Sequence, residues 1–139
     1  MNNYMRGIIA GLVATIVLSV LMYMKGMMGV MPELDIISML AGKMGGSAMM
    51  GWVAHFMIGA LAYGLGFAII GGKLPGGSSA VRGIVLGIIG WLMMMVVLMP
   101  MMGAGMFAMN MGMMAPVATL MLHVIFGAVL GLVYGKTGS

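Results

Sequence analysis

The stretch Trp52-Val53-Ala54-His55-Phe56-Met57-Ile58-Gly59 places a histidine inside a long apolar run, with a glycine one helical turn later. A related element, His123-Val124-Ile125-Phe126-Gly127, lies in the last apolar run of the chain. These are the only two histidines among 139 residues. An ionisable side chain inside a membrane segment is costly and rare. Each histidine is therefore a candidate functional residue.

The composition excludes a soluble globular domain. Hydrophobic residues make up 63% of the chain and charged residues 6%, whereas soluble chains carry about 25% charged residues. No residue from Gly83 to Leu122 is charged. Helices in lipid satisfy their own backbone groups and need no polar surface. The sequence therefore predicts an integral membrane protein with a single domain, residues 1–139.

Four apolar runs are long enough to cross the hydrocarbon core as helices. The predicted class is an all-α, four-transmembrane-helix bundle. The acidic segment between the first two runs precedes an apolar stretch that is too short to span, and we expect it to form an interfacial helix at about 33–41. Pro100 is expected to end or kink the third run. The predicted spans are 7–24, 48–71, 83–99 and 116–134.

The basic residues predict an orientation. If the N-terminus is cytoplasmic, four basic residues flank the inner side and two, Lys25 and Lys43, flank the outer side. Cytoplasmic flanks carry an excess of Lys and Arg, so both termini are expected in the cytoplasm. The six basic residues form no stripe, which argues against nucleic acid as a partner. The four on the predicted inner side are Arg6, Lys73, Arg82 and Lys136.

Two short elements recur in the same order in each half of the chain. Arg6-Gly7-Ile8-Ile9-Ala10-Gly11 returns as Arg82-Gly83-Ile84-Val85-Leu86-Gly87, and the His-x3-Gly element recurs in the second helix of each half. This pattern predicts two tandem helical hairpins, a parallel internal repeat with a pseudo-two-fold axis along the membrane normal. It also predicts that the two histidines face each other at similar depth. The glycines at four-residue spacing are typical of close helix contacts.

The motifs together resemble a known family. They are R-G-I-x2-G, the M-P-E-L-D loop, W-x2-H-F-x-I-G, and A-P-V-A-T-L-x3-H-x2-F-G-A-x-L-G-x-V-Y-G, and they cover nearly the whole chain. They resemble a family of small bacterial four-span membrane proteins that is catalogued as a domain of unknown function. The resemblance implies this architecture and the bacterial inner membrane. It implies no chemistry.

The histidine pair allows two interpretations. Imidazole is a common metal ligand, and a b-type haem with His55 and His123 as axial ligands would need flat space beside each ring. Gly59 and Gly127 are the residues that would leave this space. The alternative, which is favoured, is that each histidine is packed in the interior and hydrogen-bonded to a backbone carbonyl or a hydroxyl group.

The methionines and the acidic loop supply weaker candidates. Met106, Met109 and Met113 belong to a methionine-rich segment on the predicted outer side, and thioethers select Cu(I). Methionine as an adaptable replacement for leucine is the favoured interpretation. Glu33 and Asp35 form a possible functional loop, although helix capping or ion pairing is the simpler role.

No arrangement of nucleophile, base and orienting group is evident, and the chain has no cysteine, so we expect no enzyme activity. The favoured function is a non-catalytic membrane protein that acts as an accessory subunit of a larger assembly or as a homo-oligomer. Its expected partners are the lipid bilayer, other membrane subunits or itself, with no cofactor. The alternative is a protein that binds haem b or copper, in electron transfer or metal handling. A small transporter is a weaker alternative.

Overall fold

Four helical segments of the protein are long and apolar enough to cross a membrane. The computed structural model describes residues 2–27, 36–43, 45–101, 105–106 and 114–137, and these contain helices and no strand. The all-α class with four candidate spans is thus confirmed. The helical elements are α1 (Asn3–Met27), α2 (Ile36–Lys43), α3 (Ala48–Met57), η1 (Ile58–Tyr63), α4 (Gly64–Ile70), η2 (Gly71–Lys73), α5 (Ser79–Met93), η3 (Met94–Leu98), α6 (Met99–Met101) and α7 (Met114–Lys136).

The first and third spans begin one turn earlier than their apolar runs. The side chain of Asn2 accepts a hydrogen bond from the Met5 N–H at 2.8 Å and starts α1. The Ser78 side chain accepts from the Val81 N–H at 3.3 Å and starts α5 in the same way. Both are N-cap bonds, which satisfy an amide of the first turn. The capping residues, rather than the following apolar residues, therefore set where these helices begin.

Two of the spanning segments contain a π-helical turn. In η1 the helix widens so that the Gly64 N–H bonds to the Gly59 carbonyl, five residues back. In η3 the Met99 N–H bonds to the Met94 carbonyl in the same manner. The third span continues through Pro100 to Met101 instead of ending at residue 99. The wider turn lies immediately before a proline that has no N–H to donate.

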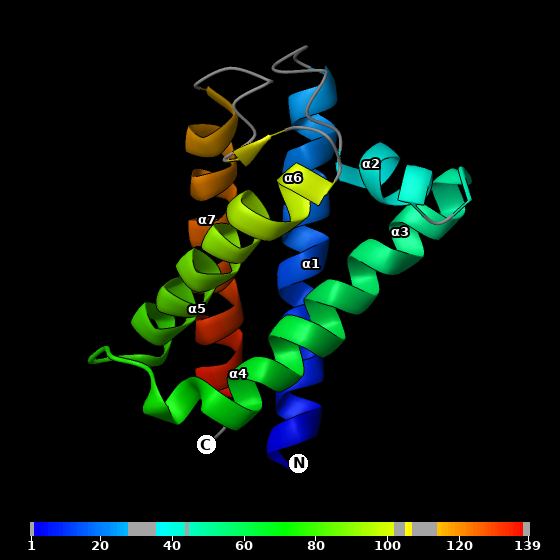
Figure 1. Ribbon diagram of the computed structural model, residues 1–139. Helices are drawn as coiled ribbons and strands as arrows, with labels where there is room; N and C mark the ends of the chain where they lie inside the picture. Colours follow the sequence, from blue (N-terminus) through cyan, green and yellow to red (C-terminus); the bar gives the residue numbers. More distant parts are fainter. Residues whose placement is uncertain (1, 28–35, 44, 102–104, 107–113, 138–139) are drawn as a thin grey trace.

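Backbone contacts at glycines hold the helices together. α1 packs on η1 and α4, α5 packs on α7, and α1 packs on α7, an arrangement visible in Figure 1. A Cβ at Gly7 would overlap the Gly64 carbonyl, and a Cβ at Gly83 would overlap the Gly127 carbonyl. The prediction that the spaced glycines mark close helix contacts is confirmed.

The contact register does not match the predicted pairing of the two His-x3-Gly elements. Gly11 lies against the carbonyl of Gly59, whereas Gly87 lies against the carbonyl of His123. In this register His123 occupies the place of Gly59, one turn away from the place of His55. The two His-x3-Gly elements therefore match in sequence but do not occupy equivalent positions in the helix packing, and this part of the repeat prediction is corrected.

Both termini lie at the same end of the bundle (Figure 1). Arg6 joins the start of α1 to the end of α7. Its Nη2 donates to the Tyr134 carbonyl at 2.7 Å, and its guanidinium carbon lies 4.0 Å from the centre of the Tyr134 ring. Cations near a helix C-terminus interact favourably with its free carbonyls. This contact connects the two hairpins at the end that carries the termini.

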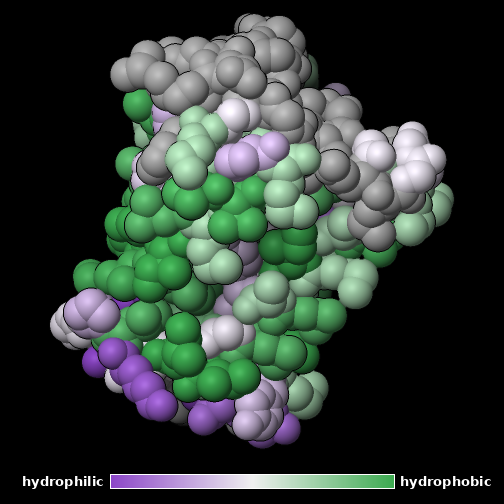
Figure 2. Space-filling model, in the orientation of Figure 1, coloured by the Kyte–Doolittle hydropathy of each residue, from purple (hydrophilic) through white to green (hydrophobic). Residues whose placement is uncertain are grey.

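The outer surface is apolar over most of the length of the bundle. Figure 2 shows hydrophilic residues gathered at the end where Figure 1 places the termini, with a broad hydrophobic band above them. Exposed apolar side chains of the spanning helices include Ile16, Ile69 and Leu132. Such a surface is suited to lipid rather than to water. Which end is cytoplasmic stays a prediction.

The short helix α2 packs beside the first turn of α3. Ile37 and Ala41 are buried, and the Ile37 carbonyl lies where a Cβ on Gly51 would stand. The described part of the predicted helix at about 33–41 belongs to α2, which continues to Lys43. Glu33 and Asp35, the residues of the possible functional loop, lie outside the described residues.

Candidate functional site

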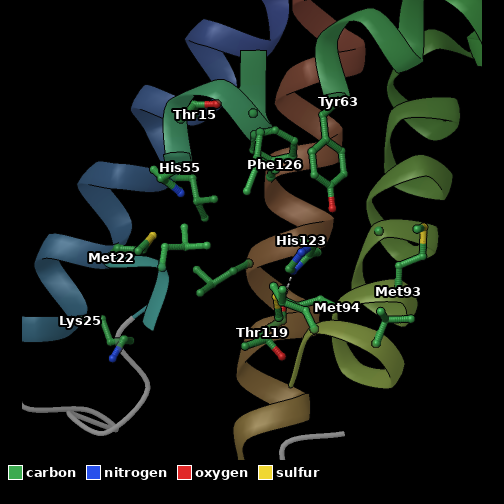
Figure 3. A pocket seen from close by; sticks show the side chains of 18 residues that line it. Thr15, Met22, Lys25, His55, Tyr63, Met93, Met94, Thr119, His123 and Phe126 are labelled. Carbon is green, nitrogen blue, oxygen red and sulfur yellow. Dashed lines mark hydrogen bonds between the residues drawn. The ribbon is translucent and has the colours of Figure 1, made fainter. Parts of the chain in front are cut away.

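A cavity of about 330 Å³ lies between the two hairpins. Every spanning segment contributes to it, with Thr15 from α1, His55 from α3, Met94 from η3 and His123 from α7. Figure 3 shows these side chains around one common space. Most of the lining is apolar, and the structure brings both histidines to the same cavity. Cavities of this size, apolar with a few polar groups, are typical of small-molecule sites.

Both π-helical turns form walls of this cavity. η1 contributes Ile58, Gly59 and Tyr63, and η3 contributes Met94, Val97 and Leu98. π-Helical turns are rare in proteins and occur frequently at functional sites. Their presence in both hairpins, on the same cavity, marks this space as the candidate site.

The cavity opens sideways, toward the region that lipid would occupy. Ile58 and Val97 line it from facing segments and are 41% and 53% exposed. The first hairpin contacts the second chiefly through α1 and α7, whereas α3 and η1 pack little against α5 and η3. Figure 2 shows a small hydrophilic recess between these two apolar surfaces. A lipophilic molecule could enter along this side without crossing the polar ends of the bundle.

His55 is a packed histidine with a hydroxyl partner. Its Nε2 lies 3.3 Å from the Ser19 Oγ, and that hydroxyl donates its single proton to the Thr15 carbonyl at 2.7 Å. Ser19 can therefore only accept from His55, so the proton of the imidazole is on Nε2. Thr15 also bonds its own helix, because its hydroxyl donates to the Gly11 carbonyl at 2.6 Å.

His123 has the opposite proton arrangement. Its Nδ1 lies 2.8 Å from the Thr119 carbonyl oxygen, which can only accept. Nδ1 therefore carries the proton, and in an uncharged imidazole Nε2 is left with a free lone pair. Among the described residues no hydrogen bond is made to this nitrogen. His123 thus presents a hydrogen-bond acceptor to the cavity.

Sequence reasoning overlooked Tyr63. Its ring meets that of Phe126 edge to face at 5.0 Å between centroids, and its centroid is 6.5 Å from that of His123. In Figure 3 its hydroxyl is directed toward His123. Tyrosines in membrane helices are concentrated at the interfaces, so a tyrosine near the middle of the second apolar run was a signal that could have identified it.

The two glycines predicted to flank a porphyrin have other neighbours. A Cβ on Gly59 would overlap the Thr15 hydroxyl, and one on Gly127 would overlap the Gly83 carbonyl. The space beside Gly127 is thus occupied by α5 and is not part of the cavity. Gly59 lines the cavity, but the position that its Cβ would take is filled by the Thr15 hydroxyl. The prediction that both leave flat space for haem is corrected, because helix contacts fill that space.

The metal candidates gain no support. Within the described part of the chain, no three His, Cys, Asp or Glu side chains gather where they could hold a metal ion. Met106 is 60% exposed and does not line the cavity. Met109 and Met113 lie outside the described residues. The arrangement around His55 and His123 therefore does not favour haem or copper.

Together the fold and the cavity define a class: a multi-pass membrane protein, built as a four-helix bundle with an apolar internal cavity. The chain belongs to the family described as Family of unknown function (DUF6789), whose model matches residues 1–139. The predicted resemblance to a family of unknown function is thus confirmed. No curated protein and no solved structure matches the chain.

Proposed function

We propose that this chain is a non-catalytic membrane protein that binds a small lipophilic molecule in the cavity between its hairpins. The observation that carries the proposal is one apolar cavity of about 330 Å³, lined from all four spans and bordered by two π-helical turns. A cavity of about 150 Å³ suffices for benzene, so this one has room for a ring with substituents. The remainder of a longer molecule would extend into the bilayer.

The chemistry of the lining favours binding over reaction. The polar groups that face the cavity are dispersed among apolar side chains, and His55 and His123 make hydrogen bonds to a hydroxyl and a carbonyl. A nucleophile next to a base, which covalent catalysis needs, does not occur among the described lining residues. The lateral opening between Ile58 and Val97 offers a path from the membrane rather than from water. Lipophilic ligands are thus the class that can reach this site.

The test is to identify what the protein retains from the membrane. The full chain is purified in a mild detergent, extracted with organic solvent and analysed by mass spectrometry. We expect one lipophilic species near equal molar amount and enriched over its share of the membrane extract. Leu122→Trp should abolish retention, because Leu122 lines the cavity. Leu132→Trp, the same change on the same helix at a side chain that is 50% exposed, should retain the species.

Two results would overturn the proposal. One is a preparation that contains only bulk phospholipids in the proportions of the membrane. The other is equal retention by both tryptophan variants, which would place the bound molecules on the outer surface. Circular dichroism of both variants confirms that each remains folded.

A further inference from the structure

We infer that the cavity recognises a ring with a free phenolic hydroxyl, through His123 as acceptor and Tyr63 as donor. This inference rests on the proposed function and names the chemistry of the ligand that the site holds. It follows from the positions of protons in the cavity, from the placement of Tyr63 and from the charge of the lining residues.

The proton on His123 is committed to its own helix. Nδ1 donates to the Thr119 carbonyl at 2.8 Å, so the Nε2 lone pair is left on a ring that lines the cavity. Leaving a polar group without a partner in an apolar interior is costly. A ligand with an O–H to donate would satisfy this nitrogen. A ligand that has only hydrogen-bond acceptors would place its own lone pair against that of His123 Nε2.

Tyr63 is positioned by a gap in the opposite helix. A Cβ at Gly90 would overlap the Tyr63 hydroxyl and stand 2.6 Å from Cε1 and Cζ of the Tyr63 ring. The side chain therefore crosses from η1 in the first hairpin to α5 in the second. Its ring packs there against Phe126 of the neighbouring helix α7. Among the residues that the structure describes, no hydrogen bond is made by its hydroxyl. That hydroxyl and His123 Nε2 can share one ligand oxygen, the tyrosine donating and the histidine accepting.

The surroundings favour an uncharged aromatic group. Lys25 is the single formally charged residue among the described lining, and Figure 3 shows it well away from His123 and Tyr63. A carboxylate at this end would have no cation beside it and no proton for Nε2. The rings of Tyr63, Phe126 and His123 surround the site, and aromatic rings pack well edge to face. A phenol combines such a ring with a stronger O–H donor than an aliphatic alcohol.

The probes 4-decylphenol and 4-decylanisole isolate this chemistry, because the methyl ether keeps the ring, the tail and the oxygen but loses the O–H. Binding is measured by equilibrium dialysis against nanodiscs with the full chain, and uptake by empty nanodiscs is subtracted. We expect the phenol to bind about tenfold tighter than the ether, the effect of one or two neutral hydrogen bonds. His123→Phe should bring the ratio close to one, whereas Tyr63→Phe should weaken the binding of both probes, because the ether oxygen can also accept from the tyrosine.

Two further variants test whether the changes in probe binding arise from His123 and Tyr63 or from a general disturbance of the protein. Leu132→Met changes an apolar residue of the same helix that does not line the cavity and should keep the preference for the phenol. Gly90→Ala keeps both polar side chains but displaces that of Tyr63, so it should weaken the binding of both probes as Tyr63→Phe does. Circular dichroism and the thermal midpoint of each variant establish that it is folded.

The outcomes separate the two proposals. If both probes bind equally well to the wild-type chain, the cavity binds lipophiles but the phenolic inference is wrong. If the preference survives in His123→Phe, the inference is equally wrong, because the acceptor is then elsewhere. If neither probe binds and the purified chain retains no lipophile, the proposed function itself fails.

Discussion

Replacing Gly127 by alanine tests whether this residue serves helix packing or leaves space for a cofactor. An added Cβ would overlap the Gly83 carbonyl and stand 3.0 Å from the Ile84 Cα. Backbone atoms cannot rotate away as a side chain can, so α5 and α7 must separate. Overpacking of this kind costs about 1–3 kcal/mol. We expect Gly127→Ala to lower the free energy of unfolding by about 2 kcal/mol.

The matched control is Gly66→Ala in α4, where an added Cβ has no neighbour within 4 Å. Alanine is the better helix former by about 1 kcal/mol, so this variant should be as stable as the wild type or more stable. Both are measured by titrating sodium dodecyl sulfate into dodecylmaltoside micelles and following near-ultraviolet circular dichroism. If Gly127→Ala is as stable as Gly66→Ala, the close α5–α7 contact is refuted.

Three further predictions concern the ends of the bundle and its orientation. Arg6→Ala should lower the thermal midpoint more than Arg82→Ala, because Arg6 bonds to the end of α7 whereas Arg82 bonds to an exposed turn; equal effects would contradict this. Trp91→Phe should lower the free energy of unfolding by about 1 kcal/mol, since its indole N–H donates to the start of α7 at 3.1 Å; an unchanged value in the detergent titration would contradict it. The chain has no cysteine, so on intact cells an impermeant maleimide should label Ser47→Cys but not Thr137→Cys, and the reverse pattern would refute cytoplasmic termini.

Composition and apolar length were sufficient to predict the membrane class. The four spans follow from long apolar runs, and the glycine contacts follow from four-residue spacing, since only these residues allow two backbones to touch. The helix ends were less accurate, because Asn2 and Ser78 begin helices through side-chain bonds that lie outside the apolar runs. Local hydrogen bonding decided these ends, whereas hydropathy decided the spans.

The cavity could not be predicted because it depends on the relation between hairpins. The sequence singled out His55 and His123, and both line the cavity, but their proton positions depend on Ser19 and on the Thr119 carbonyl. Tyr63 is the last residue of a π-helical turn, and its ring centroid lies 6.5 Å from that of His123. Such a turn has no sequence signature in this chain that distinguishes it from ordinary α-helix. The cavity therefore arises from the way the two hairpins pack, and from the sequence only its two histidines could be identified as candidate site residues.

The hydrogen bonds within the helices also explain why the cavity should favour ligands that donate protons. Thr15 donates to the Gly11 carbonyl, and His123 Nδ1 donates to the Thr119 carbonyl. Each of these lining side chains gives its proton to its own helix, a common bond for such residues in membrane helices. On the cavity side His123 Nε2 keeps a lone pair, and the Tyr63 hydroxyl is a donor near it. A molecule that only accepts can therefore pair with the Tyr63 hydroxyl, whereas one that carries an O–H can also donate to His123 Nε2.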